Sequence, residues 1–455
     1  MSEKMFTSTG RITVALVITL LMVYGVGCDS SVDSGNGGDA VTLSGRVAEY
    51  EEPSGRSGDY SGGSSVAAMN GVEGAVVTAV AVHADGSVSA LDGQATTNAS
   101  GQFTLVVEGE GASDHIRVIA EGEDGLEASA IVNVRGRSSV NIRPVTSASH
   151  AQASVFLAAR AEAEGDSHSE GANKADVSVF VNTDVAADIN SSAQAAADLG
   201  VALANAVEAQ SEFSSRTDTE VDLSAVGSAK LEAYSRFESA LAASTSSASR
   251  ASAYVNLEGD YVTIFSGTGV DMETQARLHQ TGSALLLEAG KNMSGNVETG
   301  IRKQAELIRA YATALAVEAM LEAEGASQAR RDALVSARTE LAAEIRAATS
   351  VEALAEANAA YRASVHAILE AHYAISPVVI AAAEAQIETS HALLMEAMSH
   401  ISVFLGGVAD VTAEAFSSFY ASAAADARVT FENADLAEAE AEAAARMLVL
   451  LYVLK

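Results

Sequence analysis

Three patterns of apolar and polar residues follow one another along the chain. An apolar run, Ile12–Val26, follows a short opening that carries Lys4 and Arg11. Short β-rich runs with turn residues between them follow over 41–146, and Ala-rich segments with helical spacing continue from about Ala151. We therefore predict a small antiparallel β-sandwich followed by a large all-α helical bundle.

The β-rich part is divided by residues that favour turns. Asp85-Gly86 and the segment Asn98-Ala99-Ser100-Gly101 lie between runs rich in Val, Ile and Thr. Asp-Gly between apolar runs is a strong hairpin signal, and about seven short runs at regular spacing are typical of a sandwich. Pro144 then ends the last strand, and Ser147 or Ser149 is predicted to cap the first helix.

The remainder of the chain is predicted to be helical, with an interruption over Tyr254–Gly269, where aromatic, β-branched and Gly residues mix. The predicted helices are 150–165, 176–212, 221–245, 271–292, 296–324, 327–347, 350–375, 377–405, 409–430 and 433–454. The apolar run 447–454 is too short to span a bilayer. It is predicted to dock into the bundle core, with partner or self-association as the alternative.

Two apolar stripes indicate how the helices pack. One stripe is Ile301, Ala305, Ile308, Ala312, Leu315 and Ala319, and the other is Val351, Leu354, Ala357, Tyr361, Val365 and Ile368. Alternation of large residues with Ala lets helices approach closely. Ser376-Pro377 supplies an N-cap and a first-turn proline, so 350–375 and 377–405 are predicted to form an antiparallel hairpin.

A lone cysteine follows the N-terminal apolar run. Cys28 is the only cysteine of the chain, and Gly25-Val26-Gly27 places small residues before it. This arrangement resembles the lipobox of bacterial lipoproteins, although Gly25 stands where that family usually has an aliphatic residue. The resemblance implies that Cys28 becomes the first mature residue and carries lipid, which would make the protein a membrane-anchored lipoprotein of the cell envelope, on its periplasmic or outer-membrane face.

Two other interpretations of this stretch stay open. An uncleaved membrane anchor would need ~20 apolar residues, more than this run provides. An ordinary signal peptide cut elsewhere would leave Cys28 without a role. Under the lipoprotein interpretation the chain divides into a signal peptide over 1–27, a flexible Gly/Ser/Asp-rich tether over 28–40, the β-sandwich over 41–146 and the helical domain over 147–455.

The β-rich part also carries a family resemblance. Gly45-x-Val47, Gly74-Ala75-x-Val77 and Thr97-x-x-x-Gly101-x-Phe103-x-Leu105 occur in this order, followed by the run from Ile116 to Gly122. This pattern resembles the carboxypeptidase regulatory-like domain, which has a transthyretin-like β-sandwich fold. The resemblance implies a spacer or interaction module and brings no catalytic residues.

Charge limits the partners that we expect. The chain has 60 acidic against 27 basic residues, for a net charge of −33, and only six lysines. Binding to nucleic acid requires cationic patches, so we expect no nucleic-acid partner. An acidic excess with few lysines also resembles proteins of salt-loving organisms, in which salt screens the self-repulsion.

The predicted hairpin contains the most distinctive polar residues. Glu384 and His391 interrupt its apolar stripe, Glu388 completes a Glu-x-x-His motif, and His372 lies on the facing helix. Carboxylates and imidazoles that converge inside a bundle can bind metal. Such sites need the motif twice, however, so a buried polar contact is the commoner explanation and we assign no metal ligand.

We assign no catalytic residue and no cofactor, because the sequence contains neither a phosphate-binding loop nor a nucleophile elbow. The sequence therefore predicts a non-enzymatic, lipid-anchored envelope protein that acts as a structural or partner-binding module. The alternative is an envelope protein that binds a ligand or metal in the 350–405 hairpin.

Overall fold

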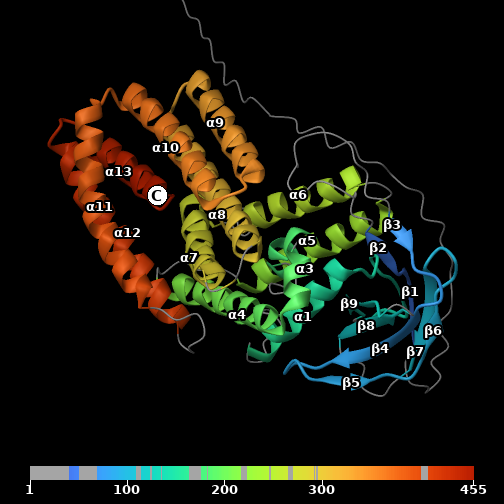
Figure 1. The fold of residues 1–455 in the computed structure, drawn as a ribbon. Helices are drawn as coiled ribbons and strands as arrows, with labels where there is room; N and C mark the ends of the chain where they lie inside the picture. The colour runs from blue at the N-terminus through green and yellow to red at the C-terminus, as the bar shows by residue number, and fades with distance from the viewer. Residues whose placement is uncertain are drawn as a thin grey trace, which may run out of the picture. The chain divides into compact units, whose positions relative to one another are not determined.

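The computed structural model describes residues 40–50, 69–108, 114–122, 125–134, 136–162, 176–181, 183–216, 223–244, 247–264, 270–291, 293, 296–400 and 408–454. An N-terminal β region precedes a large helical bundle in the described ranges (Figure 1). This order confirms the predicted succession of a β part and an all-α part. The predicted signal peptide, Cys28 and the predicted tether up to residue 39 lie outside the described residues.

The strands of the β region form small sheets that are mostly antiparallel. The strands are β1 (Val41–Arg46), β2 (Ala48–Tyr50), β3 (Met69–Gly71), β4 (Val76–Val82), β5 (Val88–Ala90), β6 (Ala95–Thr96), β7 (Gln102–Val107), β8 (His115–Glu121), β9 (Glu127–Asn133) and β10 (Ser139–Asn141). One sheet has the order β10-β1-β7, a second has the order β5-β4-β8-β9 with β6 paired to β4, and β2 pairs with β3. The pairing of β1 with β10 is parallel.

The two larger sheets bury their apolar residues in one shared core. Strand β7 alternates strictly, with Phe103, Leu105 and Val107 buried and the residues between them exposed. Leu43 of β1 and Val118 of β8 belong to the same cluster. Alternation with period two places one face of a strand against the core, which is why these runs form strands rather than helices.

The turn predictions are confirmed at two glycines. Gly86 (φ 77°) and Gly101 (φ 75°) adopt the left-handed conformation that glycine tolerates best. Asn98 shapes the second turn, because its side-chain oxygen accepts hydrogen bonds from the backbone N–H groups of Ser100 (2.9 Å) and Gln102 (3.0 Å).

The first helix, α1 (Ser147–Glu162), is joined to the β region by hydrogen bonds. Thr146 and Ser149 cap it reciprocally: the Thr146 N–H donates to Ser149 Oγ (2.8 Å), and the Ser149 N–H donates to Thr146 Oγ1 (3.2 Å). Ser149 was among the predicted caps, whereas Thr146 was not. One turn from its end, α1 is fixed again, because Arg160 Nε donates to the carbonyl oxygen of His83 (2.7 Å).

The other helices are α3 (Thr183–Ser191), α4 (Ala193–Arg216), α5 (Leu223–Ala243), α6 (Ser247–Thr263), α7 (Met272–Lys291), α8 (Asn296–Ala323), α9 (Gln328–Ala347), α10 (Val351–Tyr373), α11 (Pro377–Ser399), α12 (Val408–Glu432) and α13 (Glu438–Tyr452). Helix α11 ends at Ser399, with His400 as its C-cap, before the predicted end at residue 405. The others follow the predicted ranges closely, with three exceptions. The buried stripes of α8 and α10 are those predicted, apart from partly buried Leu315 and Ala319 and exposed Val351. The last apolar run is buried through Leu454, as predicted.

The three exceptions have local causes. The predicted helix 176–212 breaks before α4, because the Ser192 side chain accepts a hydrogen bond from the Ala195 N–H (3.1 Å) and starts a new helix. The predicted interruption over Tyr254–Gly269 was wrong up to Thr263, because Leu257 and Tyr261 recur at helical spacing and are buried in α6. The last helix starts later than predicted, after Asp435, which has a φ of 65°.

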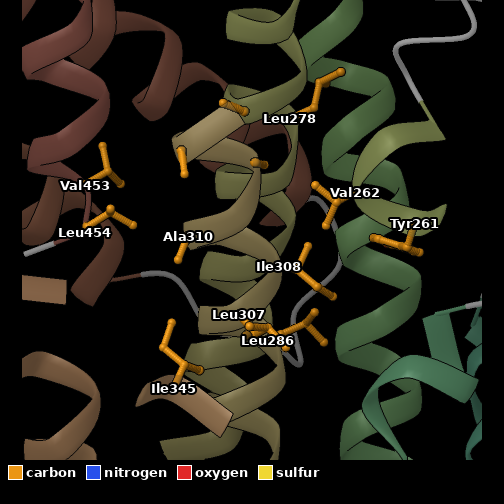
Figure 2. Packing of buried hydrophobic residues seen from close by; sticks show 14 of the residues in the cluster. Tyr261, Val262, Leu278, Leu286, Leu307, Ile308, Ala310, Ile345, Val453 and Leu454 are labelled. Atoms are coloured by element: carbon orange, nitrogen blue, oxygen red, sulfur yellow. The ribbon is translucent and has the colours of Figure 1, made fainter. Parts of the chain in front are cut away.

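Helices α7 and α8 pack against each other along their length at the centre of the bundle. Figure 2 shows Leu286 of α7 beside Leu307 and Ile308 of α8, with Ile345 of α9 and Leu454 after α13 nearby. Helix α7 also buries polar side chains, including Gln275, His279 and Gln280. Gln280 Nε2 donates to Thr313 Oγ1 of α8 at 2.9 Å, so the central pair is joined by polar as well as apolar contacts.

A buried ionic cluster lies beside this pair. Lys230 of α5 is 1% exposed, and its Nζ lies 3.1 Å from both Asp176 Oδ1 and Tyr261 Oη. Burial, and after it the positive charge of Lys230, lower the pKa of His279 from 6.5 to about 3. The folded protein therefore holds His279 neutral.

Two glycines in helices provide a test of close helix packing. A Cβ on Gly200 of α4 would lie 2.5 Å from the Cβ of Ala158 in α1, whereas nothing lies within 4 Å of a Cβ on Gly259 of α6. Gly200→Ala should destabilise the protein by about 1–3 kcal/mol through overpacking. Gly259→Ala should stabilise it by about 0.5–1 kcal/mol, because Ala is the better helix former. Urea denaturation of both variants measures the difference, and equal midpoints would contradict the described contact.

Acid should destabilise the fold through His279. Because its pKa is depressed in the folded state, its contribution to stability is complete above pH 6.5 and is lost as the pH falls towards about 3. One such group contributes a slope of up to about 1.4 kcal/mol per pH unit to the free energy of unfolding. His279→Gln should make this dependence shallower in urea titrations at several pH values. The control is His400→Gln, which removes an exposed imidazole, and parallel curves for wild type and His279→Gln would count against the assignment.

Candidate functional site

A hollow of about 380 Å³ opens between α10 and α11, and Tyr452 at the end of α13 also lines it. Helix α13 contacts both of these helices (Figure 1). The hollow is lined by Ala359, Arg362, Ala363 and His366 of α10, by Ala381, Glu384, Ala385 and Glu388 of α11, and by Tyr452 of α13.

Local sequence signals position the two helices. The Ser350 side chain accepts a hydrogen bond from the Ala353 N–H and caps α10. Ala374 ends that helix in the left-handed conformation (φ 55°), and Pro377 occupies the first turn of α11. The predicted turn between the helices is therefore present, and α11 follows α10 directly.

The contacts of the two helices explain the hollow. Helix α10 packs mainly on α9 and α8, whereas α11 packs mainly on α12, so α10 and α11 touch each other over only a short stretch. The facing positions carry alanine, which leaves space where larger side chains would meet. The predicted hairpin is thus connected at its turn but opens into a groove.

His366 and Glu384 face each other across this groove. His366 Nε2 lies 3.2 Å from Glu384 Oε1, and both side chains are partly exposed. Glu384 was among the polar residues predicted from the sequence, whereas His366 was not. The spacing along the chain could have identified His366. His366 and Glu384 are equally far from Ile375 at the turn, so they lie opposite each other in an antiparallel hairpin.

The four polar residues singled out from the sequence do not form one cluster. Glu384 and Glu388 line the hollow, but His372 does not. His372 lies against Tyr373 (ring centroids 4.5 Å apart) and 3.4 Å from Arg330 of α9, and burial together with Arg330 lowers its pKa. His391 packs edge-on against the ring of Tyr452, with the centroids 5.1 Å apart.

Within the described ranges, no three or more His, Cys, Asp or Glu residues are arranged so that they could hold a metal ion. The described helices also include none with the length and apolar character to cross a membrane. Comparisons of the chain with protein-family models, with curated proteins and with solved structures found no match.

Large apolar side chains are also exposed on α11. Met395 is 48% exposed, Leu393 is 65% exposed and Val378 is 77% exposed. Ala381, Ala385, Glu388, Ala392 and Met395 follow one another at spacings of four and three, which places them on one stripe. The wall of the hollow therefore continues as a partly apolar surface towards the end of α11.

The hollow gives a direct test of the metal interpretation. Glu384 and Glu388 line the hollow with His366, but these three side chains are not arranged as a set of metal ligands. We therefore expect the full chain, purified without chelator, to contain no stoichiometric metal by elemental analysis. One bound metal ion per chain that is lost in both Glu388→Gln and His366→Ala, but retained in His372→Ala, would contradict this expectation.

Proposed function

We propose that the protein is a lipid-anchored cell-envelope protein, attached through Cys28, whose helical bundle binds a protein partner without catalysing a reaction. The observation that carries partner binding is the hollow between α10 and α11, together with the exposed Met395 on the same face of α11. A partly apolar, concave surface next to exposed large side chains is typical of an interaction site.

The N-terminal part supports the anchor. The small residues before Cys28, the polar segment that follows it and the lack of any other cysteine fit a lipidated tether. A diacyl or triacyl anchor holds a protein stably at a membrane, since each buried CH₂ contributes about 0.8 kcal/mol. The net charge of −33 opposes attachment through anionic lipid surfaces, so the lipid would provide the attachment.

For the β region we propose a β-sandwich spacer of the carboxypeptidase regulatory-like kind. The shared core of the two larger sheets and the order of the glycine and apolar motifs support this assignment. In this arrangement the β region separates the lipid anchor from the bundle, and α1, capped by Thr146 and Ser149, connects the two.

Replacing the cysteine tests the anchor. Cys28→Ala should abolish incorporation of labelled fatty acid. Ser30→Ala is the matched control, since it changes a neighbouring small polar residue and keeps the cysteine, and it should be labelled like the wild type. Globomycin should cause a larger precursor to accumulate in the wild type. Equal labelling of Cys28→Ala, or no labelling of the wild type, would overturn lipid anchoring at Cys28.

A further inference from the structure

We propose that the groove between α10 and α11 is the docking site for a basic amphipathic α-helix of a partner protein. This inference rests on the proposed function, because it names the class of partner that the bundle binds. Three features carry it: the small side chains that line the groove, the exposed apolar surface that continues from it, and the charge of the two helices.

The alanines set the depth of the groove. Ala359 and Ala363 on α10 face Ala381 and Ala385 on α11, and all four are exposed. Small residues on both walls let the backbone of a third helix come close. Recognition of a helix in a groove uses this geometry, with apolar anchors spaced three and four residues apart on the inserted helix.

Met395 supplies the apolar anchor point. It continues the stripe that contains Ala381, Ala385 and Glu388, and it is 48% exposed. Methionine is flexible and polarizable, so it adapts to apolar side chains of different shape, and it is common on surfaces that bind amphipathic helices.

The charge of the two helices selects a basic partner. Helices α10 and α11 carry the acidic residues Glu352, Glu356, Glu370, Glu384, Glu388 and Glu396 against the single basic residue Arg362. The neighbouring helix α9 differs, since it carries Arg330, Arg331, Arg338 and Arg346 against Asp332, Glu340 and Glu344. Two of the six carboxylates, Glu384 and Glu388, line the groove beside Arg362 and His366, and the other four extend the negative charge along the two helices.

The negative charge of α10 and α11 also favours a basic helix over a second copy of this chain as the partner. Two copies that met through this groove would bring the same carboxylates together, which disfavours association. A partner helix with Lys or Arg beside its apolar stripe would instead place cations near Glu384 and Glu388, while its apolar residues cover the alanines and Met395.

Photo-crosslinking tests the proposal on the full lipidated chain in neutral detergent. The probe is a synthetic Leu/Lys amphipathic peptide of about five helical turns, or ~18 residues, with one benzophenone on its apolar face. We expect crosslinks to map by mass spectrometry to α10 and α11, with Met395 among the labelled residues. Two control peptides carry the same benzophenone: a scrambled sequence of equal composition, and a Leu/Glu version. Both control peptides should give crosslink yields that are lower than that of the Leu/Lys peptide by about tenfold or more.

A matched pair of variants isolates the groove. Ala381→Arg fills it, whereas Ala382→Arg adds the same charge at the next position, which is also exposed but does not line the hollow. Crosslinking should fall about tenfold in Ala381→Arg and stay within about twofold of wild type in Ala382→Arg. Equal yields in both variants, crosslinks outside α10 and α11, or equal labelling by the Leu/Glu peptide would overturn the proposal.

The same preparations distinguish this inference from the proposed anchor. Fatty-acid labelling of wild type and Cys28→Ala reports on lipid attachment and does not depend on the groove. If the protein is lipidated and the peptide labels no groove residue, only the basic-helix inference fails. If groove labelling is intact and the wild type incorporates no fatty acid, the lipid anchor fails and the basic-helix inference is unaffected.

Discussion

The close approach of helices through small side chains is the constraint on which this structure depends. Gly200 of α4 lies against Ala158 of α1 with no space for a methyl group, and Ala305 and Ala312 alternate with isoleucines on the buried face of α8. Alanine buries little apolar area per residue, so the bundle gains stability from many helix pairs rather than from a few large side chains. Where two facing helices diverge, as α10 and α11 do, the same small side chains leave a groove.

The polar interior follows from the same constraint. Closely packed helices leave little room for water, so each buried polar group needs a protein partner. Lys230 has Asp176 and Tyr261, and Gln280 has Thr313. Such pairs add little net stability, but removing one partner leaves a buried group unsatisfied. They therefore restrict which arrangements of otherwise similar Ala-rich helices are possible.

Much of the fold was predictable because its signals are local. The period-two alternation of β7 and the stripe of α8 are set by neighbouring residues, and the structure has both. The break at Ser192 and the continuity of α6 were not predicted, because serine occurs both inside helices and at their caps, and aromatic residues lower helix propensity only until they are buried. The candidate site was predictable in part. Glu384 stood out on its own stripe, but its partner His366 lies on another helix, and only tertiary packing shows that α10 and α11 diverge.

The parallel pairing of β1 with β10 has a mechanical consequence. Under the proposed anchoring, tension from the membrane enters at Val41, the start of β1, and leaves towards the bundle after Asn141, the end of β10. In a parallel pair these are opposite ends, so the force acts along the strands and loads the paired positions Thr42–Ser139, Leu43–Val140 and Ser44–Asn141 together. A pair pulled from the same end would open one hydrogen bond at a time. The parallel pairing of β1 with β10 therefore lets this small β region resist a pulling force between the membrane anchor and the bundle.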